Sequence, residues 1–296
     1  MHDSFDTTYS EATEPFKSQL RRFRQSHEPK VFHSNGSDWE YLTGGYGSET
    51  VLVLHGGGGP AESLFRYIDA LEETYRVIAP TVPATVTRVE DVIDVLFSIL
   101  AKEGISSVHL FGVSNGGMIG QVLLRRDPRK VHSLILFHSM LPSLSYGKRF
   151  GRRARLLSLI PSLVTLRLGL RWLKRRIRSE SVNAAPGEVA FWKAYFSELY
   201  SSGLMSKAFF VSRAKLLTDY FTNYHFEDGD LDSWTGKIFI IESENDKIVS
   251  ANERQRLKDF YRIARVHTFR GAGHLGGGLF KVEETVELIR EFLHEA

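Results

Sequence analysis

Residues 108–117, VHLFGVSNGG, decide the fold expected for this chain. A short apolar run typical of a buried strand ends just before Gly112, and a helical pattern begins directly after Ser114. The five residues from Gly112 to Gly116 match G-x-S-x-G, a pattern that places its serine on a sharp turn between a strand and a helix. Glycines two positions before and after the serine let the neighbouring backbones approach closely. This context predicts Ser114 as a nucleophile.

A second glycine-rich segment, residues 55–59 (HGGGG), follows the apolar run 51–54. The segment lacks the Lys-Ser/Thr of a phosphate-binding P-loop and departs from the dinucleotide pattern G-x-G-x-x-G. It suits instead a loop whose backbone amides stabilise a developing oxyanion, aided by the first amide of the helix after Ser114. We expect His55 to brace this loop by hydrogen bonding. The predicted oxyanion donors are Gly57 (with Gly58 as second choice) and Asn115, and the predicted oxyanion loop also contains His55, Gly56 and Gly58.

A serine hydroxyl is a weak nucleophile and needs a base that a third group orients. Asp246 lies in the loop after the strand-like run 238–241, at the edge where sites of parallel sheets gather. His274 follows another strand-like run, 265–269, and three small residues that let the loop fold over the sheet edge. We predict His274 as the base and Asp246 as the acid that orients it. Glu244 is the alternative acid.

Strand and helix patterns alternate along much of the chain, which predicts parallel βαβ units with helices on both faces of one sheet. The alternation pauses after the sixth strand and resumes near residue 235. The intervening stretch has helical patterns and is expected to be an inserted cap. The predicted organisation is a polar N-terminal extension with a short helix (1–29, the first 13 residues disordered), a catalytic core (30–139 and 235–296) and a helical cap (140–234).

These residues resemble the α/β-hydrolase superfamily over about 30–140 and 235–296, whose members carry serine, acid and histidine in that chain order. Shorter segments, 65–79, 108–117 and 131–136, also resemble maspardin, a group regarded more as a binding protein than as a proven enzyme. The glycine loop is similar to those of carbon–carbon bond hydrolases and prolyl aminopeptidases, but its proline comes later here. Relatives that use an aspartate nucleophile, such as epoxide hydrolases, differ from this chain at Ser114.

Charge and composition limit the chemistry and the partners that can be expected for this chain. The chain of 296 residues has a net charge of +3 and no cysteine, which excludes disulfides and thiolate chemistry. Eleven lysines and arginines and no acid lie in residues 148–178, interleaved with leucines. Three interpretations stay open for this cluster: a solvated face of a cap that packs by its apolar stripe, contact with an anionic membrane, or steering of an anionic substrate. Nucleic acid is not expected as a partner.

The expected function is hydrolysis of an ester or related acyl bond in a small molecule through an acyl-enzyme. No metal or organic cofactor is expected. The alternatives are a non-catalytic binding protein of this fold and a carbon–carbon bond hydrolase. The polar N-terminus is not expected to act as a secretory signal. Charged residues and Pro161 interrupt the apolar stretch 156–173, so no membrane span is expected. We expect a cytoplasmic location, with attachment to a membrane surface as an alternative.

Overall fold

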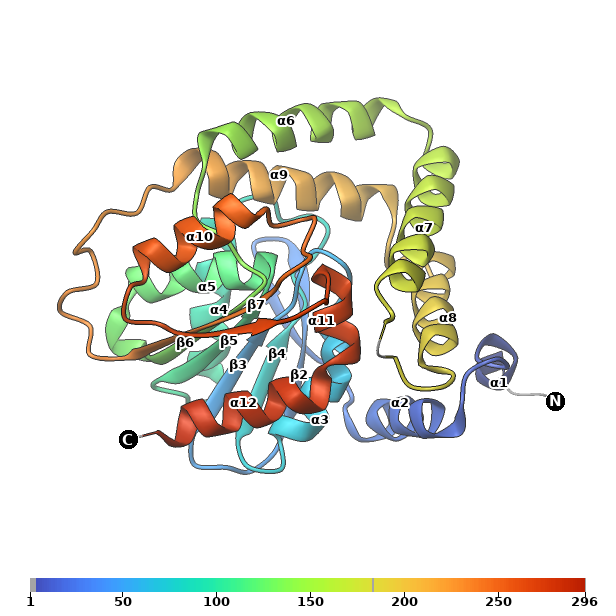
Figure 1. The fold of residues 1–296 in the computed structure, drawn as a ribbon, viewed down its shortest axis with the longest axis horizontal. Coiled ribbons are helices and arrows are strands. Elements are labelled where there is room, and N and C mark those ends of the chain that lie inside the picture. The colour runs from blue at the N-terminus through green and yellow to red at the C-terminus, as the bar shows by residue number, and fades with distance from the viewer. Residues whose placement is uncertain (1–3, 183, 296) are drawn as a thin grey trace.

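The computed structural model describes residues 4–182 and 184–295, and its centre is one eight-stranded sheet (Figure 1). The strand order is β1-β2-β4-β3-β5-β6-β7-β8. The pairs β1–β2 and β2–β4 are antiparallel, and all other neighbours are parallel. The strands are β1 (Lys30–Ser34), β2 (Ser37–Gly44), β3 (Thr50–Leu54), β4 (Arg76–Pro80), β5 (Val108–Val113), β6 (Val131–Phe137), β7 (Lys237–Ser243) and β8 (Arg265–Phe269). The expected mostly parallel sheet of an α/β-hydrolase fold is confirmed.

Helices cover both faces of this sheet (Figure 1). The α-helices in the described residues are α1 (Ser4–Thr8), α2 (Glu14–Ser26), α3 (Phe65–Leu71), α4 (Val89–Lys102), α5 (Asn115–Arg126), α6 (Leu144–Leu159), α7 (Ser162–Ser179), α8 (Glu188–Ser201), α9 (Lys207–Asn223), α10 (Ala251–Phe260), α11 (His274–Phe280) and α12 (Val282–His294). Successive side chains of a strand point to opposite faces. Val51 and Val53 of β3 accordingly pack with α3 and α12, whereas Leu52 and Leu54 pack with α4 and α5. An all-apolar strand is therefore buried on both sides, as parallel sheets require.

The structure differs from the sequence-based expectations at the N-terminus and in the helix that follows β8. The N-terminal region expected to be disordered contains α1 in its described part, and Tyr9 is fully buried against Phe191 of α8; residues 1–3 lie outside the described residues. After the glycine-rich segment the chain forms a 3-10 turn over Ala61–Leu64 and becomes α-helical at Phe65. Helix α11 was not anticipated, because three consecutive glycines within it have low helix propensity.

The insertion between β6 and β7 consists of four helices, α6 to α9, that lie over the carboxyl edge of the sheet (Figure 1). Helices α6 and α9 run side by side, with small residues of α6 at the contact. A Cβ on Gly147 would lie 2.6 Å from Thr222 Oγ1, and one on Gly151 would lie 3.5 Å from Thr218 Cγ2. Small side chains thus allow the two helices to approach closely. We call α6 to α9 the cap.

Two arginines join the cap to the rest of the molecule. Arg24 of α2 binds two carboxylates, that of Glu62 in the 3-10 turn before α3 and that of Glu198 in α8. The N–O distances are 2.8 and 2.9 Å, respectively. The buried Arg66 of α3 contacts Glu188 of α8 and Glu283 of α12. A single guanidinium presents five donors in a planar fork, so it can hold two carboxylates at once. The N-terminal extension, the core and the cap are therefore connected by shared ion pairs.

Within the described part of the chain, no helix is both long enough and apolar enough to cross a membrane.

Candidate active site

Ser114 occupies the turn between β5 and α5 in a backbone conformation that side-chain-bearing residues rarely adopt. Its φ is 52° and its ψ is −112°. The turn is compatible only with glycine at two neighbouring positions: a Cβ on Gly116 would lie 2.0 Å from the Leu54 carbonyl oxygen, and one on Gly112 would lie 2.5 Å from Gly117. Strain of this kind persists only where the surroundings enforce it, and it is common at active sites. The expected tight turn is present at Ser114.

The segment 55–59 lies against this turn. Leu54 pairs with Gly112 in the parallel ladder, so both loops leave the sheet at the same edge. A Cβ on Gly56 would lie 3.4 Å from Ser114 Cβ. Neither backbone conformation nor close packing requires glycine at positions 57 and 58. Neither residue has a positive φ, and a Cβ on either would meet nothing within 4 Å, so glycine leaves open space there rather than relieving backbone strain.

His55 is buried and holds two backbone groups. Its Nδ1 lies 2.7 Å from the Gly56 carbonyl oxygen, and its Nε2 accepts a hydrogen bond of 3.1 Å from the Val82 amide. This pattern requires the neutral ring with a proton on Nδ1. Burial, aided by the nearby charge of Arg213, lowers the pKa of His55 to about 4. His55 is thus a neutral brace for the loop, as its position in the sequence suggested.

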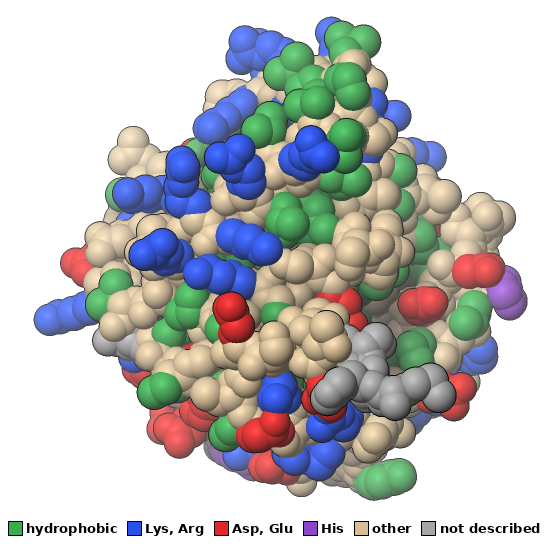
Figure 2. Space-filling model, turned by 90° about the vertical axis from the view of Figure 1, so that its right-hand side faces the viewer, with side chains coloured by type: hydrophobic (Ala, Val, Ile, Leu, Met, Phe, Trp, Pro, Cys, Tyr) green, Lys and Arg blue, Asp and Glu red, His purple; other side chains and the backbone are tan. Residues whose placement is uncertain are grey.

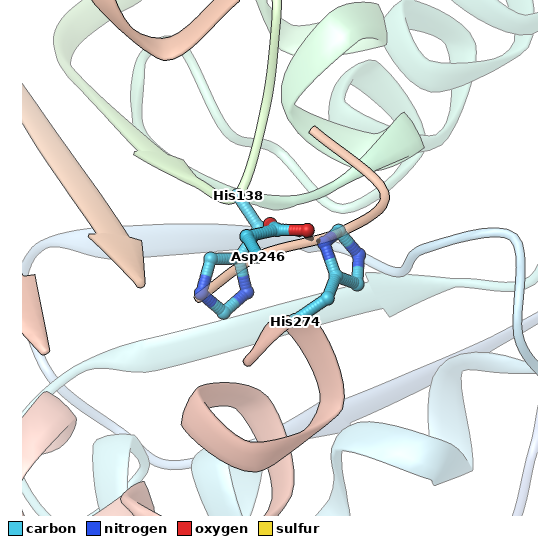
Figure 3. A group of neighbouring side chains, drawn as sticks. All are labelled: His138, Asp246 and His274. Carbon is cyan, nitrogen blue, oxygen red and sulfur yellow. Dashed lines mark hydrogen bonds and ion pairs between the residues drawn. The ribbon is translucent and has the colours of Figure 1, made fainter. Parts of the chain in front are cut away.

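Asp246 and His274 meet over the carboxyl ends of β7 and β8 (Figure 3). His274 Nδ1 donates to Asp246 Oδ2 at 2.7 Å, and Asp246 Oδ1 accepts from the amides of Ile248 and Val249 at 2.7 and 2.9 Å. Both oxygens of this buried carboxylate are therefore occupied by donors. Burial alone would raise the pKa of Asp246, but the hydrogen bonds and the charge of His274 outweigh it and hold the pKa below its ordinary value. Asp246 is kept ionised opposite His274.

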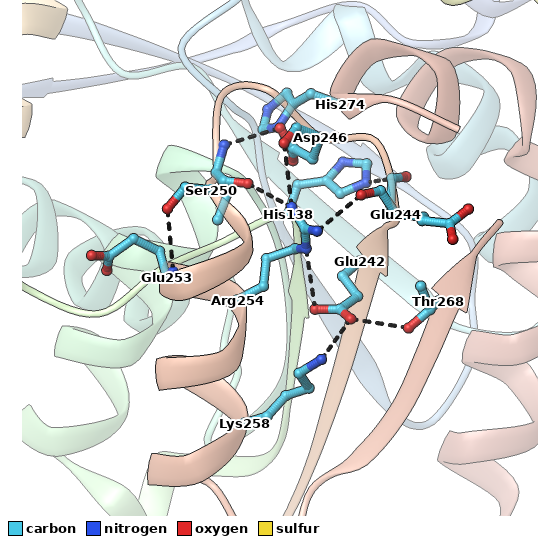
Figure 4. Close-up of polar contacts among 12 residues, drawn as sticks. His138, Glu242, Glu244, Asp246, Ser250, Glu253, Arg254, Lys258, Thr268 and His274 are labelled. Atoms are coloured by element: carbon cyan, nitrogen blue, oxygen red, sulfur yellow. Dashed lines mark hydrogen bonds and ion pairs between the residues drawn. The ribbon is translucent and has the colours of Figure 1, made fainter. Parts of the chain in front are cut away.

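Arg254 of α10 holds the loop that carries Asp246 (Figure 4). Its guanidinium donates to the carbonyl oxygens of Asp246, Val249 and Glu244, at 3.3, 2.8 and 2.9 Å. The Glu244 side chain points elsewhere: it is exposed, and its Oε2 accepts from the Gly271 amide at 2.8 Å. Of the two candidate acids, only Asp246 contacts His274.

His138 is a site residue that sequence reasoning missed. It follows β6 at the same edge, is buried, and has a φ of 53°. Its ring stacks on that of His274 with centroids 4.8 Å apart, and its Nε2 lies 2.8 Å from Ser243 Oγ. Figure 3 shows the two rings together with Asp246. Burial, followed by the neighbouring His274, lowers the pKa of His138 well below its ordinary value, so the ring is neutral. Its position directly after a buried strand, like that of Ser114, is the signal that could have identified it.

The same residue connects the two halves of the site. The Ser114 amide donates to the Phe137 carbonyl oxygen at 2.7 Å, and the next residue, His138, packs against His274. Ser114 and the Asp246–His274 pair are thus at the same edge of the sheet, after β5, β7 and β8. In the described residues, the Ser114 hydroxyl has no hydrogen-bond partner. Such contacts are often long before substrate binds and tighten in the complex.

A metal site is the other possible use of this cluster. His138, Asp246 and His274 each offer a ligand atom, and these atoms lie within 4.8 Å of one another. However, the carboxylate oxygens already accept three hydrogen bonds, and Nε2 of His138 is paired with Ser243. The direct contact between Asp246 and His274 leaves no room for an ion between them. The geometry favours an acid–histidine pair over metal ligation.

Glu180, at the end of α7, binds the helix that begins with His274. Its Oε2 accepts from the amides of Leu275 and Gly276 at 2.7 and 3.0 Å, and its Oε1 pairs with Arg176. The first amides of a helix have no partner within the helix, so a carboxylate there supplies the missing acceptor and complements the helix dipole. The cap thus stabilises α11 at its first turn, where His274 is located.

The chain matches the α/β hydrolase family over residues 51–287 and belongs to that family. The chain spans less than half the length of the curated relatives that it matches. One of these relatives is an uncharacterized hydrolase of Bacillus subtilis, which is 30% identical over 124 residues. The aligned residues are 38% of this chain and 45% of the relative.

Solved structures with the same fold cover nearly the whole chain. A hydrolase of Pseudomonas aeruginosa has a TM-score of 0.72 at 14% identity, covering 90% of this chain and 99% of that one. A meta-cleavage product hydrolase of Pseudomonas fluorescens has a TM-score of 0.65 at 20% identity (89% and 97%), and a carboxylesterase of Bacillus subtilis has 0.63 at 15% (95% and 97%). At these identities the likeness establishes the fold. The local resemblance to maspardin stays a prediction.

Proposed function

We propose that this α/β hydrolase cleaves an ester or related acyl bond of a small molecule through a serine acyl-enzyme. The observation that carries the proposal is the buried Asp246–His274 hydrogen bond at the sheet edge where Ser114 sits in its strained turn. A fixed acid–histidine pair beside a serine is the arrangement that activates a hydroxyl as a nucleophile. The proposed chemistry requires no metal or organic cofactor.

In this mechanism Ser114 Oγ attacks the acyl carbon while its proton passes to His274 Nε2. Asp246 holds the ring by Nδ1 and stabilises its positive charge. The amides of Asn115 and Gly57 are proposed to donate to the oxyanion of the tetrahedral intermediate. The proton on His274 then passes to the leaving alkoxide, which departs as an alcohol. Water, deprotonated by His274, attacks the acyl-enzyme, and the acid product leaves with Ser114 restored.

A fluorophosphonate probe tests the nucleophile directly, because it labels only an activated serine. We expect labelling of the wild-type chain and turnover of p-nitrophenyl esters, with both lost in Ser114→Ala; the turnover should fall by about 10³-fold or more. Ser139→Ala is the matched control, since Ser139 is a buried serine near the same edge that has no proposed role. A folded wild-type protein without labelling or turnover between pH 6 and pH 9 would overturn the proposal in favour of a binding protein.

The same assay separates ester from carbon–carbon bond cleavage. A panel of esters, thioesters and lactones is compared with an enolisable diketone, because the fold is shared by a carboxylesterase and a meta-cleavage product hydrolase. Faster turnover of esters by the wild type supports the proposal. Turnover of the diketone alone would assign the chain to the carbon–carbon class.

A further inference from the structure

The outer face of α6 and α7 combines exposed apolar side chains with exposed cations. Seven of the fourteen large apolar side chains that are exposed in the described residues lie between residues 144 and 172. Six of them lie around the junction of the two helices: Leu156, Leu159, Leu163, Val164, Leu168 and Trp172. We call this surface, together with the cations around it, the basic–apolar face. Figure 2 shows hydrophobic and basic side chains gathered on the upper part of this side of the molecule.

Part of the apolar stripe of α6 and α7 faces solvent, which differs from the pattern expected for a packed cap. In α6 the small residues Gly147 and Ala154 are buried, whereas Leu159 is 81% exposed. In α7 only Thr165, Leu173 and Ile177 are buried. The interpretation of an apolar stripe that packs on the core therefore holds for Leu173 and Ile177 but not for the four leucines of residues 148–178 that are exposed. Solvent-exposed leucine clusters are uncommon on monomeric proteins and mark interaction surfaces.

The charge on this face is uncompensated. Nine of the eleven basic residues in 148–178 are exposed, and among the described residues only Arg176 of the eleven forms an ion pair, with Glu180. On α7, Arg167 and Arg171 alternate with Leu168 and Trp172 along the exposed side. A concavity of about 390 Å³ on α7 is lined by three apolar and three basic side chains, and none of the active-site residues line it.

We infer that the basic–apolar face docks on an anionic phospholipid bilayer, with α6 and α7 lying in the interface. Helices with exposed leucine and tryptophan beside lysine and arginine bind bilayers in this way, because apolar side chains enter the acyl boundary and cations meet lipid phosphates. Nucleic acid would satisfy the cations but leave the leucines in water. The inference does not rest on the proposed catalysis, so a Ser114→Ala protein is expected to bind equally well.

Trp172 provides a local reporter. It is 53% exposed, whereas Trp39 and Trp192 are buried. The full-length protein is mixed with vesicles of phosphatidylcholine alone or with about one third phosphatidylglycerol. With the anionic vesicles we expect co-sedimentation, a blue shift of tryptophan emission and quenching by brominated acyl chains. The shift and the quenching should disappear in Trp172→Phe. Binding should weaken about tenfold or more between about 0.05 M and about 0.5 M salt, where the Debye length becomes short.

Two variants separate the contributions of charge and apolar contact. Arg152→Glu/Arg167→Glu/Arg171→Glu removes cations, and Leu159→Ser/Leu163→Ser/Leu168→Ser removes apolar contacts; each is expected to weaken vesicle binding about tenfold or more. Arg262→Glu/Ile263→Ser changes an exposed basic–apolar pair elsewhere and should bind as wild type. All substituted side chains are exposed, and circular dichroism verifies the fold of each variant.

Three results would overturn the inference. The first is equal binding to neutral and anionic vesicles, or to neither. The second is loss of binding in the charge variant alone, with duplex DNA bound as tightly as vesicles, which would assign a general polyanion surface. The third is a dimer in sedimentation that dissociates in the leucine variant without any vesicle binding, which would assign the face to a second copy of the chain.

Discussion

Replacing Glu180 with alanine tests whether the cap supports the helix that carries His274. The carboxylate accepts from two α11 amides at 2.7 and 3.0 Å and pairs with Arg176, and its side chain is only 9% exposed. Hydrogen bonds to charged groups contribute roughly 1.5–3 kcal/mol each, and water that enters the site recovers part of that. We expect Glu180→Ala to lower the free energy of unfolding by about 3 kcal/mol and Glu180→Gln, which keeps an acceptor, by about 1 kcal/mol.

Activity should fall as well, because His274 is the first residue of α11. A displacement of about 1 Å in a catalytic group can cost up to about 10²-fold, so we expect kcat to drop between about tenfold and about 10²-fold with little change in KM. Urea unfolding and p-nitrophenyl ester kinetics measure the two effects. Glu287→Ala, an exposed glutamate on α12, is the matched control. A Glu180→Ala protein with wild-type stability and kcat would refute the reasoning.

Three further predictions follow from buried groups. His55 has a pKa of about 4 in the folded chain and about 6.5 in the unfolded chain, so between these values only the unfolded chain gains the proton as the pH falls. Urea titrations should therefore show that the free energy of unfolding falls by about 2 kcal/mol between pH 7 and pH 5. This loss should be absent in His55→Asn. Gly116→Ala should cost about 3 kcal/mol or more, because its methyl meets the Leu54 carbonyl, while Gly58→Ala stays within about 0.5 kcal/mol; equal midpoints in urea would contradict this. Asp246→Asn should lower kcat about 10³-fold or more, whereas Glu244→Gln retains it, and the opposite ranking would make Glu244 the acid.

Much of the sheet could be predicted because strand burial leaves a direct mark on the sequence. The run 51–54 has no polar residue, and it forms a strand buried on both faces. Helix α5 begins directly after Ser114, where its pattern indicates. Helix α11 could not be predicted in the same way. Its glycines are held helical by tertiary contacts, among them the carboxylate of Glu180, which lies 95 residues before Leu275.

Some residues of the candidate site could also be predicted from the sequence, and others could not. Ser114, Asp246 and His274 follow strands, and their common edge follows from parallel topology. The position of His138 after a buried strand could be predicted, but its ring contact with His274 joins two loops that are distant in the sequence. The basic cluster of the cap could be recognised from the sequence, but the sequence did not show whether its leucines face the core or the solvent. Helical periodicity identifies an apolar stripe without saying whether the stripe faces a core or a membrane.

The ion pairs of Arg24 determine where the chain can be truncated without loss of contacts to the cap. The family match begins at residue 51, yet Arg24 and Tyr9 both bind Glu198 of the cap, and Leu20 and Phe23 belong to the same buried cluster as α3 and α12. Residues 9–24 therefore connect the cap to the core, and β1 and β2 form one edge of the sheet. A truncated chain that starts at the family boundary would release the cap from one side, so the unit that unfolds cooperatively is larger than the unit that defines the family.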